Sequence, residues 1–185
     1  AALYNYNAAN GHNVAIGDSA GYDLTSGQNN VFVGHKSGYN QTTATGEIAI
    51  GYEALYTNQT NAQNVAIGYQ ALKLSNGDES NTAVGYQTGT AITTGDNNVF
   101  IGNAAGQATT VGEDNVFIGS GAGYTNVDGS NSVAIGYRAL FVQEPSGATD
   151  CFNTSVGHLA GTSVTTGIKN TLIGGGAGDA MTTGS

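Results

Sequence analysis

The chain has 185 residues, a formal net charge of −9 and only 9% charged residues, together with 30 glycines, one proline, one cysteine and no tryptophan. So few side chains of helix-forming type argue against a helical protein. The four cationic side chains are too few to neutralise the phosphates of a nucleic acid or to hold the chain on an anionic membrane.

The apolar content argues for a folded chain. Hydrophobic residues make up 39% of the sequence and recur in a regular order, which disordered segments do not show. No apolar run reaches the roughly 20 residues that a membrane-spanning helix needs, so membrane insertion is not expected. Cys151 has no second cysteine to pair with, and we expect it to be a small apolar filler.

A phrase of the form V-x-I-G recurs along the whole chain. Its closing glycine returns every seventeen residues, except for one interval of twenty-one between Gly136 and Gly157. A fixed period is typical of a solenoid, in which each repeat is buried only by its neighbours. We therefore expect residues 1–185 to be a single repeat array that begins and ends in mid-repeat. The phrase glycines are Gly17, Gly34, Gly51, Gly68, Gly85, Gly102, Gly119, Gly136, Gly157 and Gly174.

A short strand is predicted before each phrase glycine, because β-branched residues two positions apart line one face of a strand. The residue between them is also mostly apolar, commonly Ala or Phe. A strand that is apolar on both faces is buried on both faces, which predicts that the rod associates laterally with copies of itself. The pairs are Val14 and Ile16, Val31 and Val33, Ile48 and Ile50, Val65 and Ile67, Thr82 and Val84, Val99 and Ile101, Val116 and Ile118, Val133 and Ile135, Thr154 and Val156, and Thr171 and Ile173.

Asparagine stands four residues before the phrase glycine in eight of the ten repeats, with Glu47 and Ser132 as the exceptions. Asparagine is poor in strands, so its regularity predicts a ladder in which each amide bonds to the amides above and below it. In the loop that follows, glycines such as Gly27 and Gly95 recur ten residues after the phrase glycine and predict turns with positive φ. One repeat is then a flattened coil of two short strands and two turns.

Several phrases resemble known families. The phrases "NVAIG" (13–17 and 64–68), "SVAIG" (132–136) and "NTAVG" (81–85) resemble the YadA-like head repeats of trimeric autotransporter adhesins, and "NVAIGYQAL" (64–72) resembles the β-roll arrays of phage tail fibres. The resemblance covers essentially the whole chain. It implies a left-handed parallel β-roll, packed as a homotrimer, that serves as a non-enzymatic shaft or adhesive head. The unit here is longer than the adhesin head repeat, so the choice between the two relatives stays open, with the phage fibre as the preferred reading.

Three other solenoids fit the residues less well. The acyltransferase type needs an aliphatic residue at every sixth position, and no such register is present. The calcium-binding type needs the pattern G-G-x-G-x-D, which is absent. One column of threonines is reminiscent of an ice-binding face, but it is incomplete and only one residue wide. It holds Thr25, Thr42, Thr93, Thr110, Thr165 and Thr182.

Catalytic constellations are not evident, so no enzymatic activity, cofactor or metal is expected. His35 and His158 occupy equivalent positions seven repeats apart, and no Ser and Asp recur beside them as a triad would require. The adjacent acids at 78–79 and 113–114 could imitate the paired carboxylates of a polysaccharide depolymerase, but neighbouring loop acids are usually just solvated.

Two features are candidates for surface contact. Tyr52, Tyr69 and Tyr86 follow the phrase glycine in three successive repeats, which predicts a stack of rings that packs against itself or binds the face of a sugar. The longer interval comes from an insertion at 141–152, which contains Phe141, Gln143 and Glu144. An interrupted repeat commonly places a loop outside the stack.

The sequence therefore predicts a structural shaft or adhesive segment of a trimeric fibre, located on a virion surface or outside a cell. Its expected partners are two further copies of itself and a host-surface glycan or protein. The alternative is a carbohydrate-binding adhesin module that uses the tyrosine stack or the insertion. A depolymerase is a third and weaker reading.

Overall fold

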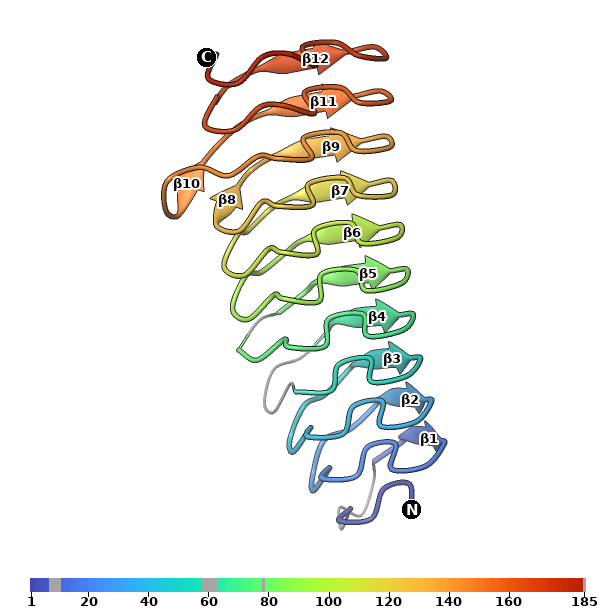
Figure 1. The fold of residues 1–185 in the computed structure, drawn as a ribbon. Helices are drawn as coiled ribbons and strands as arrows, with labels where there is room; N and C mark the ends of the chain where they lie inside the picture. Colours follow the sequence, from blue (N-terminus) through green and yellow to red (C-terminus); the bar gives the residue numbers. More distant parts are fainter. Residues whose placement is uncertain (7–10, 58–62, 78, 185) are drawn as a thin grey trace.

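The computed structural model describes residues 1–6, 11–57, 63–77 and 79–184, and within these ranges the fold is all-β (Figure 1). Ten short strands form one parallel sheet in which each strand lies beside the strand of the next repeat. Two further strands of two residues each, β8 and β10, form a separate parallel pair. The predicted parallel β-solenoid is confirmed.

The strands of the main sheet each precede a phrase glycine, as predicted. They are β1 (Val14–Ile16), β2 (Val31–Val33), β3 (Ile48–Ile50), β4 (Val65–Ile67), β5 (Thr82–Val84), β6 (Val99–Ile101), β7 (Val116–Ile118), β9 (Val133–Ile135), β11 (Thr154–Val156) and β12 (Thr171–Ile173). The additional pair is β8 (Gly129–Ser130) and β10 (Thr149–Asp150).

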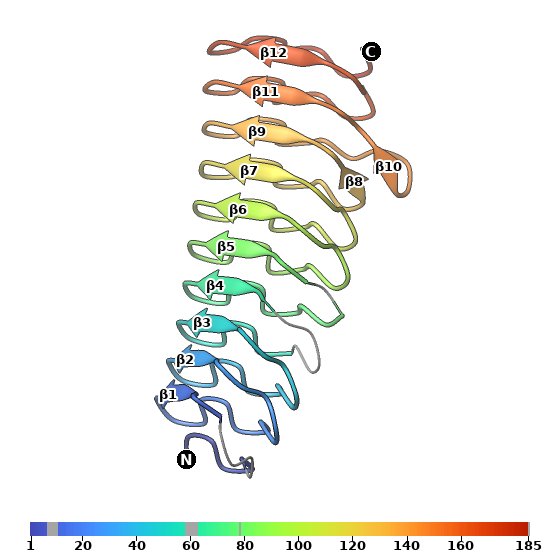
Figure 2. The ribbon, with the colours of Figure 1, turned by 180° about the vertical axis from the view of Figure 1, so that it is seen from behind.

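The coils stack in strict register. Val99 of β6 lies opposite Val116 of β7, and the same pairing continues across the insertion, where Val133 of β9 lies opposite Thr154 of β11. Figures 1 and 2 show the two termini at opposite ends of the stack and the β8–β10 pair at the edge of the coils away from the main sheet. Equivalent residues of successive repeats therefore form columns that run along the rod.

The two faces of each strand have different surroundings. The central residue points into the coil, and Phe32, Ala49 and Phe100 are completely buried. The β-branched residues on either side of it point outward and are partly exposed, as Val99 and Ile101 are in β6. The face that lines the coil is thus the one with Ala and Phe, and the β-branched face lies on the surface.

Large and small side chains compensate one another inside the coils. Phe32 fills the space beside Gly21 and Gly38, where a Cβ on either glycine would overlap its ring. In coils where the strand centre is Ala, the position four residues after the phrase glycine can hold a buried leucine instead, as Leu55 and Leu72 show. Where both positions are small, as at Ala83 and Gly89, Phe100 and Leu72 of the neighbouring coils lie against the glycine and fill the space.

A buried ladder of asparagines runs along the stack, as predicted. The Asn98 backbone N–H donates to Asn81 Oδ1 at 2.8 Å, and Asn98 Nδ2 donates to the Gly112 carbonyl at 2.8 Å and to Asn81 Oδ1 at 3.1 Å. The next coil repeats these bonds, since the Asn115 N–H donates to Asn98 Oδ1 at 3.0 Å. Each amide thus satisfies backbone groups in two coils that would otherwise be buried without partners.

The ladder continues through the insertion because a glutamine takes the place of the missing amide. Ser132 stands where asparagine is expected, and Gln143 Nε2 donates to Ser132 Oγ at 3.0 Å and to Asn126 Oδ1 at 3.2 Å. Asn153 Nδ2 in turn donates to Gln143 Oε1 at 3.0 Å. Gln143 therefore bridges the coils on either side of the longer interval.

The second strand predicted for each repeat is wrong. After the phrase glycine the described chain forms turns, because the second and fourth residues past that glycine have positive φ, as Lys36 (φ 55) and Gly38 (φ 57) do. Their N–H groups bond in opposite directions, from Lys36 to the Asp18 carbonyl at 3.0 Å and from Gly38 to the Ala54 carbonyl at 2.9 Å. This alternation links the coils without an extended strand.

The predicted role of the loop glycines also needs correction. The sequence analysis predicted positive φ for Gly27 and Gly95, but both glycines have φ angles outside that region. A Cβ on Gly27 would overlap the Ala44 carbonyl oxygen of the next coil, and one on Gly95 would overlap that of Gly112. These glycines are needed because two backbones approach closely, whereas the phrase glycine needs both the close approach and a positive φ.

Asn98→Ala tests the ladder. The substitution leaves the Gly112 carbonyl and the Asn115 N–H without their partner in a buried site, and each such group costs about 1–3 kcal/mol. We expect the free energy of unfolding, measured with urea, to fall by about 2–4 kcal/mol. The control is Asn103→Ala, an exposed position, which should change it by less than about 0.5 kcal/mol. Equal effects of the two substitutions would contradict the role of the ladder.

Candidate functional site

An apolar surface strip follows the main sheet along its whole length. We call it the β-branched strip, and it consists of the first and third residues of the ten strands of that sheet. It is most exposed near the ends of the stack, where Ile16 is 61% and Ile173 is 70% exposed, and it remains accessible in the middle at Ile101. The sequence predicted a second apolar face, and the structure places it on the outside of the single chain.

A row of aromatic rings begins directly after the phrase glycines, as predicted. The ring centroids of Tyr52 and Tyr69 are 5.1 Å apart, as are those of Tyr69 and Tyr86, and His35 stacks on Tyr52 at 5.5 Å. We call these four residues the Tyr52 row. Its three tyrosines are 40–50% exposed.

A second aromatic row runs beside the first and was missed by the sequence analysis. Tyr4, Tyr22, Tyr39 and Tyr56 stack at centroid separations of 5.1, 5.1 and 5.3 Å, and we call them the Tyr22 row. Tyr22, Tyr39 and Tyr56 lie five positions after a phrase glycine, and Tyr4 precedes the first phrase glycine. Tyrosines seventeen residues apart at 22, 39 and 56 were a sufficient signal for ring stacking, although this position was considered only as a possible aliphatic register.

Polar side chains connect the two rows. Gln70 Nε2 donates to Glu53 Oε2 at 3.0 Å, and Gln87 Nε2 donates to Gln70 Oε1 at 3.0 Å. Lys73 Nζ lies 2.7 Å from Glu53 Oε2 and 6.0 Å from the centre of the Tyr56 ring. Glu53 therefore anchors a hydrogen-bonded chain that crosses three coils between the aromatic rows.

The surroundings of Glu53 stabilise its charged form. Burial of this side chain, which is 12% exposed, by itself raises its pKa, but hydrogen bonds with Lys73, Gln70 and Tyr52 outweigh burial and hold the pKa below the ordinary value. The same hydrogen bond with Glu53 raises the pKa of the Tyr52 hydroxyl. The site is thus a fixed negative charge that is already matched by Lys73.

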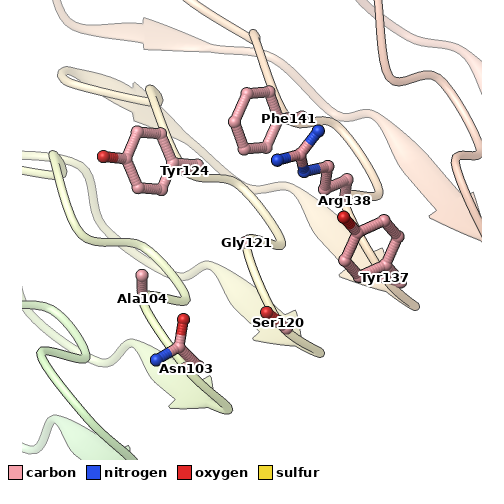
Figure 3. Close-up of a pocket in the computed structure, with 8 residues that line it drawn as sticks. All are labelled: Asn103, Ala104, Ser120, Gly121, Tyr124, Tyr137, Arg138 and Phe141. Carbon is pink, nitrogen blue, oxygen red and sulfur yellow. The ribbon is translucent and has the colours of Figure 1, made fainter.

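The Tyr52 row is interrupted in the sixth and seventh coils, and the polar chain ends in the sixth coil at Gln107, whose Nε2 donates to Gln87 Oε1 at 3.2 Å. Asn103 and Ser120 replace the tyrosines, and Ala104 and Gly121 replace the long polar side chains. The result is a pocket of about 270 Å³, which we call the notch. Figure 3 shows Gly121 near its centre, with the rings of Tyr124 and Phe141 on one side and Asn103 and Ser120 on the other.

The aromatic stacking resumes on the far side of the notch. Tyr137 stacks on His158 with centroids 5.3 Å apart, and Tyr124 stacks on Phe141 at 5.0 Å. The guanidinium carbon of Arg138 lies 4.7 Å from the centre of the Phe141 ring and 5.3 Å from that of Tyr137. The notch is therefore closed on one side by a cation held between two aromatic rings.

The insertion contributes less free surface than predicted. Glu144 is exposed, but Gln143 is only 1% exposed, so the expected surface contact through Gln143 is wrong. Its amide is held inside the stack by the ladder. Phe141 is partly buried and lines the notch. The insertion also returns to the stack, because β10 pairs with β8.

Catalytic groups do not come together in the described part of the chain. His35 and His158 serve as rings of the aromatic rows, and Cys151 is buried. Of the acidic pairs, Glu113 and Asp114 are exposed, while Asp78 lies outside the described residues. Across the described ranges no cluster of three His, Cys, Asp or Glu side chains is arranged to hold a metal ion. The same ranges contain no helix long and apolar enough to cross a membrane.

Comparison with protein-family models, with curated proteins and with solved structures found no match to this chain. The resemblance to YadA-like and tail-fibre repeats therefore stays a prediction that rests on the phrases themselves.

Glu53→Gln tests the polar chain through the pH dependence of stability. A carboxylate whose pKa is lowered in the folded state contributes stability above its unfolded pKa and loses it as the pH falls through the folded pKa. We expect the wild type to lose more stability than Glu53→Gln between about pH 6 and about pH 3. The exposed Glu113→Gln is the control and should follow the wild type in thermal unfolding. Parallel curves for wild type and Glu53→Gln would rule out this contribution.

Proposed function

We propose that the chain is a non-catalytic shaft or adhesive segment of a homotrimeric fibre, such as a phage tail fibre or a similar surface appendage. In this role it gives reach and attaches the particle or cell to a host surface. The proposal places the chain on a virion or outside a cell and requires neither nucleic acid nor membrane insertion.

The observation that carries this proposal is the β-branched strip. Ten consecutive strands present Val, Ile or Thr outward, and in the interior strands these side chains are partly exposed in the single chain, with Ile101 at 38%. A contiguous apolar surface of this kind marks an interaction site. Because every coil repeats the same strip in register, identical strips on other copies match it along the whole rod, which favours self-association.

The shape of the chain supports a mechanical role. A stack of coils joined through in-register hydrogen bonds converts sequence length into distance, with each coil adding about 4.8 Å. The rod has long, regular rows of side chains on its surface, and its described residues include no group of three His, Cys, Asp or Glu side chains arranged to hold a metal ion. Such a structure suits display and spacing better than chemistry.

Ile101→Lys tests the strip as the seam between copies. The side chain is 38% exposed, so the single chain can accommodate lysine, whereas a packed seam would bury an unpaired charge at a cost of several kcal/mol. We expect light scattering to give three times the mass of the 18.6 kDa chain for the wild type and a shift toward the single-chain mass for the variant.

Asn103→Lys is the matched control, because it adds the same charge two residues away on an exposed position outside the strip. It should assemble like the wild type. A wild-type chain that stays monomeric at all concentrations would contradict the proposed trimer, and the solenoid would then act as a single chain.

A carbohydrate-binding adhesin module is the second candidate, and the exposure of the Tyr52 row favours it. The exposed ring edges recur at a regular spacing and can pack against the apolar faces of sugars. If this is the function, Tyr69→Ala should reduce binding to immobilised glycans at least tenfold, or about 1.4 kcal/mol. Tyr22→Ala, in the other aromatic row, is the comparison. Equal loss in both variants, or none in either, would argue against the Tyr52 row as the binding surface.

A further inference from the structure

The notch is a break in otherwise continuous surface rows. Upstream, the positions after the phrase glycine hold tyrosines followed by Glu53, Gln70 and Gln87, and these side chains fill the surface between the aromatic rows. In the sixth and seventh coils the same positions hold shorter residues, among them Ala104 and Gly121. The hollow therefore results from missing side chains on an intact backbone, so it is preformed.

Arg138 is the charged group of the notch and is not neutralised. Among the described residues no carboxylate lies within ion-pair distance of its guanidinium group. The contrast is Lys73, which occupies the position of the Tyr22 row in its coil and pairs with Glu53 at 2.7 Å. Phe141 and Tyr137 hold the Arg138 side chain from two sides, so its donors are oriented before a ligand arrives.

The other residues of the notch supply complementary chemistry. Tyr137 is 44% exposed and offers an accessible ring, while the Ser120 hydroxyl and the Asn103 amide offer donors and acceptors (Figure 3). A planar cation beside aromatic rings and small polar groups suits a ring-shaped ligand with one carboxylate and several hydroxyl groups. A volume of about 270 Å³ is at the low end for ligand pockets, so the notch has room for a single ring.

The charge of the whole chain narrows the class of ligand. A net charge of −9 repels polyanions such as polyphosphates or nucleic acids, and only one cation faces the notch. A ligand with one negative charge per ring meets less repulsion and still gains a bidentate contact with a guanidinium group.

We propose that the notch binds one carboxylate-bearing pyranose, a uronic acid residue of a surface glycan. Arg138 binds the carboxylate, Tyr137 packs against the sugar ring, and Ser120 and Asn103 bond to its hydroxyl groups. This inference deepens the attachment role proposed above and rests on it, but it does not depend on the trimer. It also assigns the contact to the notch and not to the Tyr52 row.

The test is saturation-transfer difference NMR of the complete 185-residue chain with methyl β-D-glucuronide. We expect signals from the sugar ring protons, with a dissociation constant at least about tenfold lower than for methyl β-D-glucoside, which lacks the carboxylate. Acetate at the same concentration should not displace the glucuronide, because it lacks the ring. Effective displacement by acetate, or equal binding of the uncharged glucoside, would overturn the proposal.

Three variants locate the site. Arg138→Gln and Ala104→Gln place glutamine where the backbone has the same left-handed conformation as at Gln70 and Gln87, so the coils can accept it. The first removes the charge and the second extends into the notch, and each should weaken glucuronide binding at least about tenfold. Lys36→Gln is the matched control, since it removes the same charge from the equivalent position of another coil, and it should bind like the wild type.

The outcomes separate this inference from the proposed function. Equal losses in Lys36→Gln and Arg138→Gln would show that only overall charge matters and would overturn the notch as the site, as would the absence of binding at millimolar glucuronide. Light scattering of the same samples reports assembly independently. A trimer that does not bind glucuronide would contradict only the proposed role of the notch. Glucuronide binding by a monomer would contradict the trimer and support the notch as the binding site.

Discussion

The buried asparagine ladder is the interaction on which the remaining structure depends. Each amide bonds to backbone groups of its own coil and of the neighbouring coil, so it fixes both the separation and the register of the stack. A slip of one residue would remove these bonds and would turn the inward strand face outward. The ladder therefore ensures that equivalent side chains stand above one another for the length of the rod.

The stacking of the coils also explains how the chain tolerates unusual backbone conformations. Non-glycine residues with positive φ recur in each coil, and Lys36 and Gln70 are two of them. Such conformations cost of order 1–3 kcal/mol each and persist only when the surroundings over-determine them. Here the N–H groups of Lys36 and Gln70 donate to carbonyls of the preceding coil, Asp18 at 3.0 Å and Tyr52 at 2.8 Å. The N–H of Leu55, which also has positive φ, donates to the Ala71 carbonyl of the following coil at 3.1 Å. Hydrogen bonds to neighbouring coils thus offset the backbone strain within each coil.

Strict register gives the surface its functional character. Side chains seventeen residues apart in sequence become neighbours at strand spacing. A residue that recurs at the same position of successive coils therefore forms a row, and a different residue at that position interrupts the row. The Tyr52 row and the β-branched strip are examples of continuity, and the notch is an example of interruption. In the functions proposed here, the continuous β-branched strip serves association between copies, and the interrupted aromatic row creates a site for one ligand.

Much of the fold was predictable from the seventeen-residue period of the sequence alone. The strands, the asparagine ladder and the stacking of Tyr52, Tyr69 and Tyr86 follow from residues seventeen positions apart lying side by side. The turns after the phrase glycine were not predictable, because their φ angles are imposed by contacts between coils and not by local residue preference. Nor was the burial of Gln143 predicted, although it shares its column with the buried Leu24 and Ile92. The notch was not predicted, because it arises where short residues replace the long side chains of the other coils.

The most direct test of this account is amide hydrogen exchange at the backbone N–H groups that donate to the ladder. Ser132 donates to Asn115 Oδ1 at 3.0 Å, and Asn170, beyond the insertion, donates to Asn153 Oδ1 at 2.9 Å. If Gln143 makes the ladder continuous, both groups should exchange as slowly as that of Asn98, within about tenfold. Much faster exchange at Ser132 and Asn170 than at Asn98 would show that the stack divides at the insertion, and the claim of one continuous ladder would fail.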